Sequence, residues 1–213
     1  MSFFTHLILL YNNLNDKLIL TLNSQISPFI SSILVLDNIF DYKKFYILFA
    51  IIFVCVKLLL KDKNTATKKA IFEYYYNLSI NFFISGLVVL SLKTLIDAVR
   101  PVCKNIILAN PDVITNITSN LYCNQSFPSG HTSFAVIFSL VTFRYCNKFF
   151  KFILCLLVCA VSLSRIMIGA HSIIDIVGAL VINFIIVNIN HKFFTKFSSY
   201  IFNKYQKYFI HIL

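Results

Sequence analysis

The chain has 213 residues, of which 58% are hydrophobic and only 13% are charged, and its mean hydropathy is +0.79. Soluble domains carry roughly 25% charged side chains, so this composition excludes a water-soluble globule, a disordered chain and a small disulfide-stapled domain. A formal net charge of +11 would favour nucleic-acid binding in a soluble chain, but here the lysines and arginines flank apolar segments. That pattern indicates a polytopic membrane protein that does not bind nucleic acid.

The order of polar and apolar residues before residue 45 allows two interpretations. Leucines recur at steps of three and four residues from Leu7 to Leu22, with asparagines and aspartates between them, which is typical of an amphipathic helix in the membrane interface. The run 17–36 is also long enough to cross the bilayer. No basic stretch followed by a small-residue cleavage pattern is found, so we expect no removable signal peptide.

Five further apolar segments are candidates for transmembrane helices. A hydrocarbon core about 30 Å thick needs about 20 helical residues, and local thinning allows a somewhat shorter segment to cross. The segments are 45–60, 78–99, 131–143, 149–164 and 172–190, of which the third is short. We therefore predict an all-α membrane bundle of six transmembrane helices in one domain, 1–213, or five spans plus an N-terminal interfacial helix.

The clusters of basic residues predict the orientation. Lysines and arginines gather in 57–69, 144–151 and 192–207, and such clusters mark the cytoplasmic side. The connections 100–130 and 165–171 then face outward, in agreement with the alternation of the spans. A composition rich in Ile, Asn, Lys, Phe and Tyr is typical of an AT-rich bacterial genome, so we expect a bacterial cytoplasmic membrane.

Charged residues at the ends of spans are costly and indicate function. Lys93 and Arg100 are seven residues apart, nearly two helical turns, so we expect both on one face of a helix that continues to Pro101. Asp97 would lie on a nearby face. The alternative is that both cations extend to the interface without a chemical role.

The sequence Pro128 to His131 stands where a loop turns into a span. A helix cap would explain Ser129 without any chemistry. The functional interpretation is that helix-start amides, approached closely at Gly130, bind an anion. His131 would then lie beside that anion as a proton donor or acceptor.

A third group of polar residues surrounds the start of the last span. Asp175 follows His171 by one helical turn, so its carboxylate can hold one imidazole nitrogen and leave the other free to attack. Arg165 ends the preceding span. A structural ion pair at a helix start is the alternative interpretation.

Up-and-down connectivity brings all these residues to one end of the bundle, away from the lysine-rich loops. Three cations with helix amides suit a doubly or triply charged oxyanion such as phosphate, and phosphoryl transfer requires mainly positioning and charge neutralisation. A metal site is disfavoured, because Asp175 is the only well-placed carboxylate and the cysteines lack zinc spacing.

The motifs KTLIDAVRP at 93–101, PSGH at 128–131 and SRIMIGAHSIID at 164–175 together resemble the type 2 phosphatidic acid phosphatase superfamily over residues 93–190. The resemblance implies that His171 attacks phosphorus to form a phosphohistidine, oriented by Asp175. His131 would protonate the leaving group and later activate water. No metal or other cofactor is implied. The phosphate-binding residues would be Lys93, Arg100, Arg165, Ser129 and Gly130.

A site at the outer ends of the spans is reached from the lipid headgroup layer. The expected partner is therefore a lipid phosphate in the bilayer: undecaprenyl diphosphate, phosphatidylglycerol phosphate, phosphatidate or a lipid A phosphate. Two alternatives are a lipid phosphotransferase that uses the same intermediate and a non-catalytic lipid-binding protein, although His131 and the pair His171 and Asp175 count against the latter. The related vanadium haloperoxidases are soluble and do not fit the apolar spans. The sequence does not predict an oligomeric state.

Two smaller features concern packing. Cys103 and Cys123 both fall in the predicted outer loop, where oxidation is possible, and a disulfide and a free pair are equally consistent with the sequence. The pairs 85–86 and 178–179, each with one glycine and a second small residue, predict close helix approach.

Overall fold

The structure is a computed structural model that describes residues 64–104 and 123–205 together with Leu14, Lys17 and Thr21. The predicted span 45–60, the N-terminal segment 17–36 as a whole and most of the predicted outer loop lie outside the described residues. Among those described, every regular element is a helix, in agreement with the all-α prediction. The helices are α4 (Thr65–Ile96), α5 (Pro101–Lys104), α7 (Gly130–Thr142), α8 (Lys148–Met167) and α9 (Ile173–Lys204).

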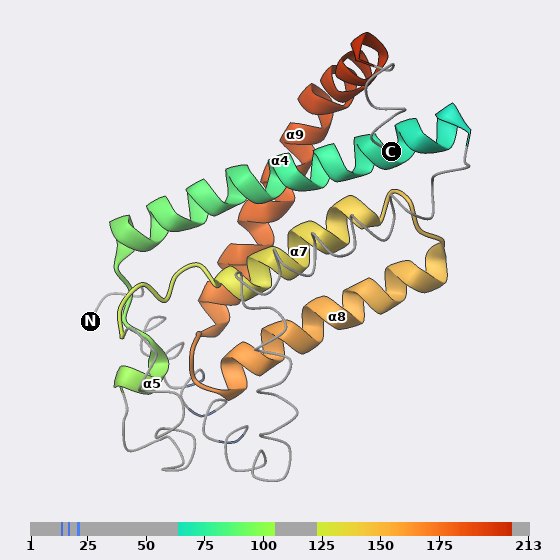
Figure 1. Cartoon of the computed structure of the whole chain (residues 1–213). Coiled ribbons are helices and arrows are strands. Elements are labelled where there is room, and N and C mark those ends of the chain that lie inside the picture. The colour runs from blue at the N-terminus through green and yellow to red at the C-terminus, as the bar shows by residue number, and fades with distance from the viewer. Residues whose placement is uncertain (1–13, 15–16, 18–20, 22–63, 105–122, 206–213) are drawn as a thin grey trace.

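Helix α7 lies at the centre of the described bundle. It packs against α4, α8 and α9, and α4 also packs against α9. Figure 1 shows α7 and α8 as an antiparallel pair joined by a short turn, with α9 crossing α4. Because the long helices alternate in direction, the C-terminal ends of α4 and α8 lie at the same end of the bundle as the N-terminal ends of α7 and α9.

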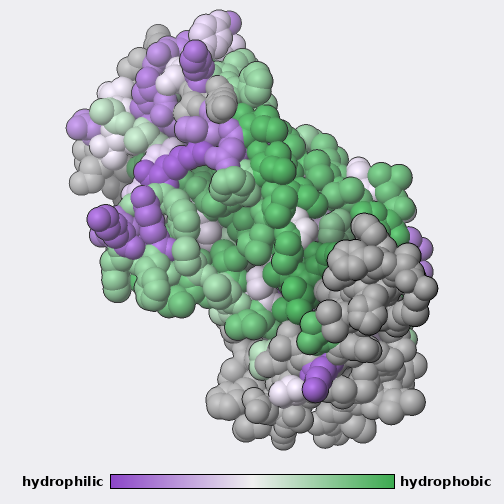
Figure 2. Space-filling model, turned by 180° about the vertical axis from the view of Figure 1, so that it is seen from behind, coloured by the Kyte–Doolittle hydropathy of each residue, from purple (hydrophilic) through white to green (hydrophobic). Residues whose placement is uncertain are grey.

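Within the described part of the chain, three helical segments are long and apolar enough to cross a membrane: Thr65–Cys103, Lys148–Met167 and Ile173–His191. Helix α7 has only 13 residues, or about 20 Å at ~1.5 Å per residue, which confirms that this segment is short. Figure 2 shows a broad hydrophobic surface across the middle of the molecule and hydrophilic residues gathered toward one end. These features are those of a helical membrane protein.

Two helices are longer than the apolar runs that predicted them. Helix α4 begins at Thr65 rather than at 78, and α9 continues to Lys204 rather than ending near 190. Asn64 caps the first turn of α4 by accepting a 2.9 Å hydrogen bond from the backbone of Thr67. The apolar run marks only the part of a helix inside the bilayer, because the backbone ladder continues through polar residues in water.

The predicted shared helical face of Lys93 and Arg100 is wrong. Helix α4 ends at Ile96, and Asp97 adopts a left-handed conformation with φ 43°. Arg100 directly precedes Pro101, the first residue of α5. A proline disfavours helical conformation in the residue before it and is itself favoured at the first helical position. The chain therefore turns between the two cations, and Arg100 reaches the site from a separate segment.

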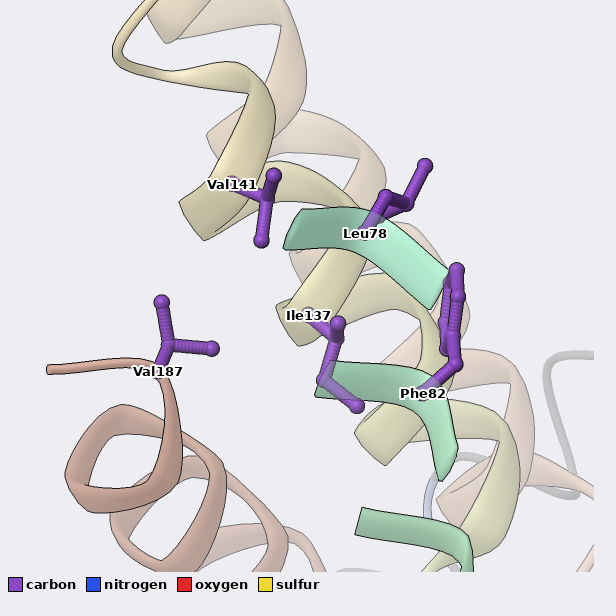
Figure 3. Close-up of a cluster of buried hydrophobic side chains, with 5 residues drawn as sticks. All are labelled: Leu78, Phe82, Ile137, Val141 and Val187. Atoms are coloured by element: carbon purple, nitrogen blue, oxygen red, sulfur yellow. The ribbon is translucent and has the colours of Figure 1, made fainter. Parts of the chain in front are cut away.

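One hydrophobic core cluster of the described residues lies where α4, α7 and α9 meet. Figure 3 shows Leu78 and Phe82 of α4 beside Ile137 and Val141 of α7, with Val187 of α9 pointing toward them. All five side chains are buried. This cluster holds the three helices together below the end that carries the polar motifs.

Polar side chains also join α4 to α9 within the bundle. Ser85 Oγ donates a hydrogen bond to Asn183 Oδ1, and Asn190 Nδ2 donates one of 3.0 Å to Asn81 Oδ1. Such interhelical bonds contribute about 0.6–2 kcal/mol each in membrane proteins. The predicted packing role of the pair 85–86 is thus met by Ser85 but not by Gly86, where an added Cβ would meet nothing within 4 Å.

Candidate active site

His171 and Asp175 form the centre of the polar end of the bundle. His171 lies just before α9, and Asp175 lies in the first turn of that helix. The distance from His171 Nδ1 to Asp175 Oδ2 is 3.6 Å, and both side chains are buried. Asp175 Oδ2 also accepts a 2.7 Å hydrogen bond from the backbone of Ser172, the residue that caps α9. The aspartate therefore has both a helix-capping role and a position against the imidazole.

Ser126 is a third member of this cluster, and it is not among the site residues predicted from the sequence. Its hydroxyl donates a 2.6 Å hydrogen bond to Asp175 Oδ2 and lies 3.5 Å from His171 Nδ1. The side chain is almost fully buried. Its position two residues before Pro128 places it at the edge of a recognised motif, but a lone serine in a loop gives no signal of this contact.

The surroundings of His171 favour the neutral imidazole. Burial lowers the pKa of His171 well below its ordinary value, and the positive charges of Arg165 and Arg100 act in the same direction, while Asp175 opposes them. An imidazole that is neutral at pH 7 has a free lone pair. Because Nδ1 faces Asp175, Nε2 is the ring nitrogen that points away from this carboxylate.

The three predicted cations converge on this pair from separate segments. Arg165, buried in the last turn of α8, uses its backbone carbonyl to accept hydrogen bonds of 3.1 Å from the backbones of Ala170 and His171. Its guanidinium acts electrostatically on His171, as does that of Arg100. Lys93 interacts electrostatically with Arg100 and Asp175. The structure therefore brings Lys93, Arg100, Arg165, His171 and Asp175 together.

The segment 123–126 is tied to the chain around Arg100. Backbone hydrogen bonds of 2.8 Å run from Arg100 to the Cys123 carbonyl and from Ser126 to the Ala98 carbonyl. Lys93 Nζ donates to the Gln125 carbonyl. These contacts connect the first motif to the loop that leads into the second and fix the backbone of Ser126.

Cys103 and Cys123, at the two ends of the outer segment, form a disulfide with a Cα–Cα distance of 5.6 Å. This settles the alternative that the sequence left open. The bond joins the end of α5 to the residue whose carbonyl accepts from Arg100. It therefore closes the outer segment next to a predicted phosphate-binding residue.

The start of α7 provides the second motif. The Ser129 hydroxyl accepts a hydrogen bond of 3.4 Å from the backbone of Thr132, so this residue caps the helix, and its own backbone donates to the Asp175 carbonyl at 3.1 Å. A Cβ added at Gly130 would meet nothing within 4 Å, so the backbone there faces open space. His131 follows in the first turn and is half-buried.

Gly178 supports the same loop from α9. A Cβ added at Gly178 would lie 2.2 Å from Cε2 of Phe127. The close approach predicted for this glycine is therefore made by an aromatic ring rather than by another helix. Phe127 lies between Ser126 and Pro128 in the chain. The packing of its ring against α9 therefore positions the residues on either side.

The chain is similar to known proteins in its sequence and in its fold. A family model described as the PAP2 superfamily matches residues 74–199, more than half of the chain. The solved structure of LpxE from Aquifex aeolicus is similar with a TM-score of 0.62 and 24% identity, over 84% of this chain and 96% of that one. At that identity the likeness shows the fold. A search of curated proteins finds no match.

Proposed function

Because the chain belongs to the PAP2 superfamily, we propose that this membrane phosphatase hydrolyses a lipid phosphate monoester or diphosphate through a phosphohistidine and without a metal ion. The observation that carries the proposal is the buried pair His171 and Asp175 with three cations around it. A nucleophile, an orienting carboxylate and charge neutralisation are the components that phosphoryl transfer needs.

In the first step, His171 Nε2 attacks phosphorus, a bond from nitrogen to phosphorus forms, and the ester bond from phosphorus to oxygen breaks. His131 gives a proton to the departing oxygen. Asp175, which lies 3.6 Å from Nδ1, stabilises the positive charge that develops on the imidazole. In the second step water attacks phosphorus, His131 accepts its proton, and His171 leaves as a neutral imidazole.

The phosphoryl oxygens are bound by side chains and by the start of α7. Guanidinium groups bind phosphate oxygens bidentately, and a lysine adds a point charge. Gly130 leaves the backbone of α7 open to the same group. Ser129 is used as the helix cap, so we assign its contribution to the backbone geometry of this turn. The cation set is Lys93, Arg100 and Arg165.

The substrate is proposed to be a lipid because the site lies at the end of helices that are long and apolar enough to cross a membrane. The four candidate classes named from the sequence all place a phosphate at the depth of the headgroup layer. Orientation follows from charge: the ends of α4 and α9 opposite the site carry the lysine clusters, and basic clusters face the cytoplasm. The site is then extracytoplasmic, in a bacterial cytoplasmic membrane.

The test is phosphate release by the purified full chain in detergent, with a chelator present, from the four candidate lipids. We expect release from at least one, and loss of about 1,000-fold or more in the variant His171→Ala because the nucleophile is removed. His191→Ala is the matched control, since this histidine lies 16 residues after Asp175 on α9, or about 24 Å along the helix. It should retain normal activity.

Several results would contradict the proposal. Full activity of His171→Ala would exclude this residue as nucleophile. If the chelator abolished activity and magnesium restored it, the reaction would depend on a metal ion and the metal-free mechanism would be wrong. Orthovanadate, which resembles phosphate in shape and charge, should inhibit the enzyme at millimolar concentration. No inhibition would contradict the proposed set of phosphate-binding residues.

The orientation has its own test. A fluorescent protein fused after Leu213 should fold and emit light if the C-terminus is cytoplasmic. Because α9 crosses once, that result supports an outward-facing His171. A dark but stable fusion would place the C-terminus outside and reverse the assigned side.

A further inference from the structure

A cavity of about 490 Å³ opens between α4 and α7, which lie side by side in Figure 1. Apart from one lysine and two serines, every residue that lines it is apolar or a glycine. Along α4 the lining runs from Phe82 to Lys93, or about 16 Å at ~1.5 Å per residue. The cavity is therefore elongated along the helix and extends from the polar end of the bundle into its apolar part.

The two ends of this cavity differ in chemistry. Lys93 and Gly130 line the end that belongs to the proposed phosphate site, whereas Phe82 and Ile137 of the hydrophobic core line the other end. Leu90, also in the lining, is 63% exposed on the apolar outer surface of α4. The cavity is thus a groove with a cationic head and an apolar body that borders the region of the lipid tails.

Two glycines keep this groove open. Gly86 and Gly130 both line it, and a Cβ added at either would meet nothing within 4 Å. A glycine inside a helix costs about 1 kcal/mol relative to alanine, and no neighbouring atom at Gly86 requires one. The empty volume beside the backbone is the structural consequence of these two residues.

We propose that this groove holds the hydrocarbon chain of the lipid phosphate while its phosphate lies at Lys93 and His171. This assignment rests on the proposed function and adds to it a binding site for the hydrocarbon chain of the substrate. Ligand cavities of roughly 300–1,000 Å³ are typical of sites for small molecules, and the lining matches a hydrocarbon at one end and an anion at the other. An unbranched or prenyl chain would lie along α4.

The test compares hexadecyl phosphate with butyl phosphate, which carry the same reacting group on a long and a short chain. In the unaltered protein, kcat/KM for phosphate release should be higher for the hexadecyl ester. The variant Gly86→Leu fills the groove and should lower kcat/KM for hexadecyl phosphate by about tenfold or more, since burial of two methylenes suffices for that factor. Butyl phosphate should be hydrolysed as before.

Two further variants control for folding. Gly86→Ala adds only a methyl group and should give a smaller loss with the long ester and an unchanged unfolding temperature or a higher one. Leu87→Phe enlarges a neighbouring side chain that is 52% exposed and does not line the groove. It should leave both esters unaffected.

The outcomes separate the groove from the reaction. If Gly86→Leu lowered kcat/KM equally for both esters, or did not lower it for the hexadecyl ester, the groove would not be the site of the hydrocarbon chain. The phosphatase assignment would remain intact. No phosphate release by the unaltered protein from any lipid or alkyl phosphate would overturn the proposed function and, with it, the occupant of the groove.

Discussion

Ser126 donates a 2.6 Å hydrogen bond to Asp175 Oδ2, the same oxygen that faces His171 Nδ1 at 3.6 Å. This one carboxylate oxygen therefore accepts hydrogen bonds from the Ser126 hydroxyl and the Ser172 backbone, and it also faces the imidazole. The serine holds the carboxylate, and the carboxylate orients the histidine. Ser126 is thus a positioning residue for the proposed nucleophile.

The variant Ser126→Ala should lower kcat by about 10- to 100-fold, the range expected when a hydrogen bond to a charged group worth about 1.5–3 kcal/mol is lost in the transition state. KM should change little, because the Ser126 side chain is almost fully buried and its hydroxyl bonds to Asp175. Steady-state kinetics on the best lipid substrate measure both quantities.

Ser139→Ala is the control, because Ser139 is also buried and its hydroxyl donates to the Leu154 carbonyl of α8. It should keep a normal kcat. A Ser126→Ala variant with unchanged kcat and a raised KM would show that the serine acts on substrate binding instead.

The disulfide between Cys103 and Cys123 should stabilise both the fold and the site. It closes a sequence separation of 20 residues, for which chain entropy predicts about 3 kcal/mol. The double variant Cys103→Ser with Cys123→Ser should therefore lower the unfolding temperature by roughly 10 °C. Activity should fall as well, because Arg100 loses its fixed partner at the Cys123 carbonyl.

Thermal unfolding in detergent measures the first effect, and phosphate release measures the second. Cys155→Ser with Cys159→Ser is the matched control, since both are free and exposed, and it should leave the unfolding temperature unchanged. Equal unfolding temperatures for the disulfide variant and the unaltered chain would contradict the stabilising role.

The sequence predicted which residues converge at one end of the bundle, because that result depends only on the alternation of spans and the spacing of motifs. It did not predict how they are held. Ser126 approaches Asp175 across 49 positions of the chain, and the pairing of 123–126 with the residues around Arg100 is made by backbone groups. Contacts of these kinds leave no periodicity or composition in a single sequence.

The helix ends show the same limit. Hydropathy located the apolar part of α4, but its first residue, Thr65, is set by the Asn64 cap, and its last, Ile96, is set by the turn before Pro101. Treating residues 93–100 as one helix placed Lys93 and Arg100 on one face. That shared face is wrong because α4 ends before Arg100, although the two cations are still near enough to interact electrostatically.

The buried His171 should make stability fall at acidic pH. Its folded-state pKa lies below the ordinary value of about 6.5, so between the two values the unfolded chain binds a proton that the folded chain does not. This group costs no stability above about pH 6.5. As pH falls below that value, the free energy of unfolding decreases, with a limiting slope of about 1.4 kcal/mol per pH unit.

Unfolding temperatures measured in detergent from pH 7 to pH 5 test this sign. The variant His171→Gln removes the titrating group and should lose less stability over that range than the unaltered chain. A steeper loss in His171→Gln would mean that the folded protein favours the charged imidazole, which would contradict the effect of burial.

A pair of glycines in helix interiors provides the last prediction. Gly178→Ala would place a methyl group 2.2 Å from the ring of Phe127, whereas Gly86→Ala meets nothing within 4 Å. The first substitution should destabilise the protein by about 1–3 kcal/mol, as overpacking does. The second should be neutral or stabilise it by up to about 1 kcal/mol, because alanine favours the helix.

The two variants should also differ in activity on a short-chain phosphate, which does not depend on the groove. Displacement of Phe127 moves Ser126 on one side and Pro128 on the other, so Gly178→Ala should lower kcat while Gly86→Ala retains it. Unfolding temperatures and kcat measured side by side check both statements. Equal behaviour of the two variants would mean that the Phe127 ring moves aside freely, and the support of the loop by α9 would then have to come from the hydrogen bond between the Ser129 backbone and the Asp175 carbonyl.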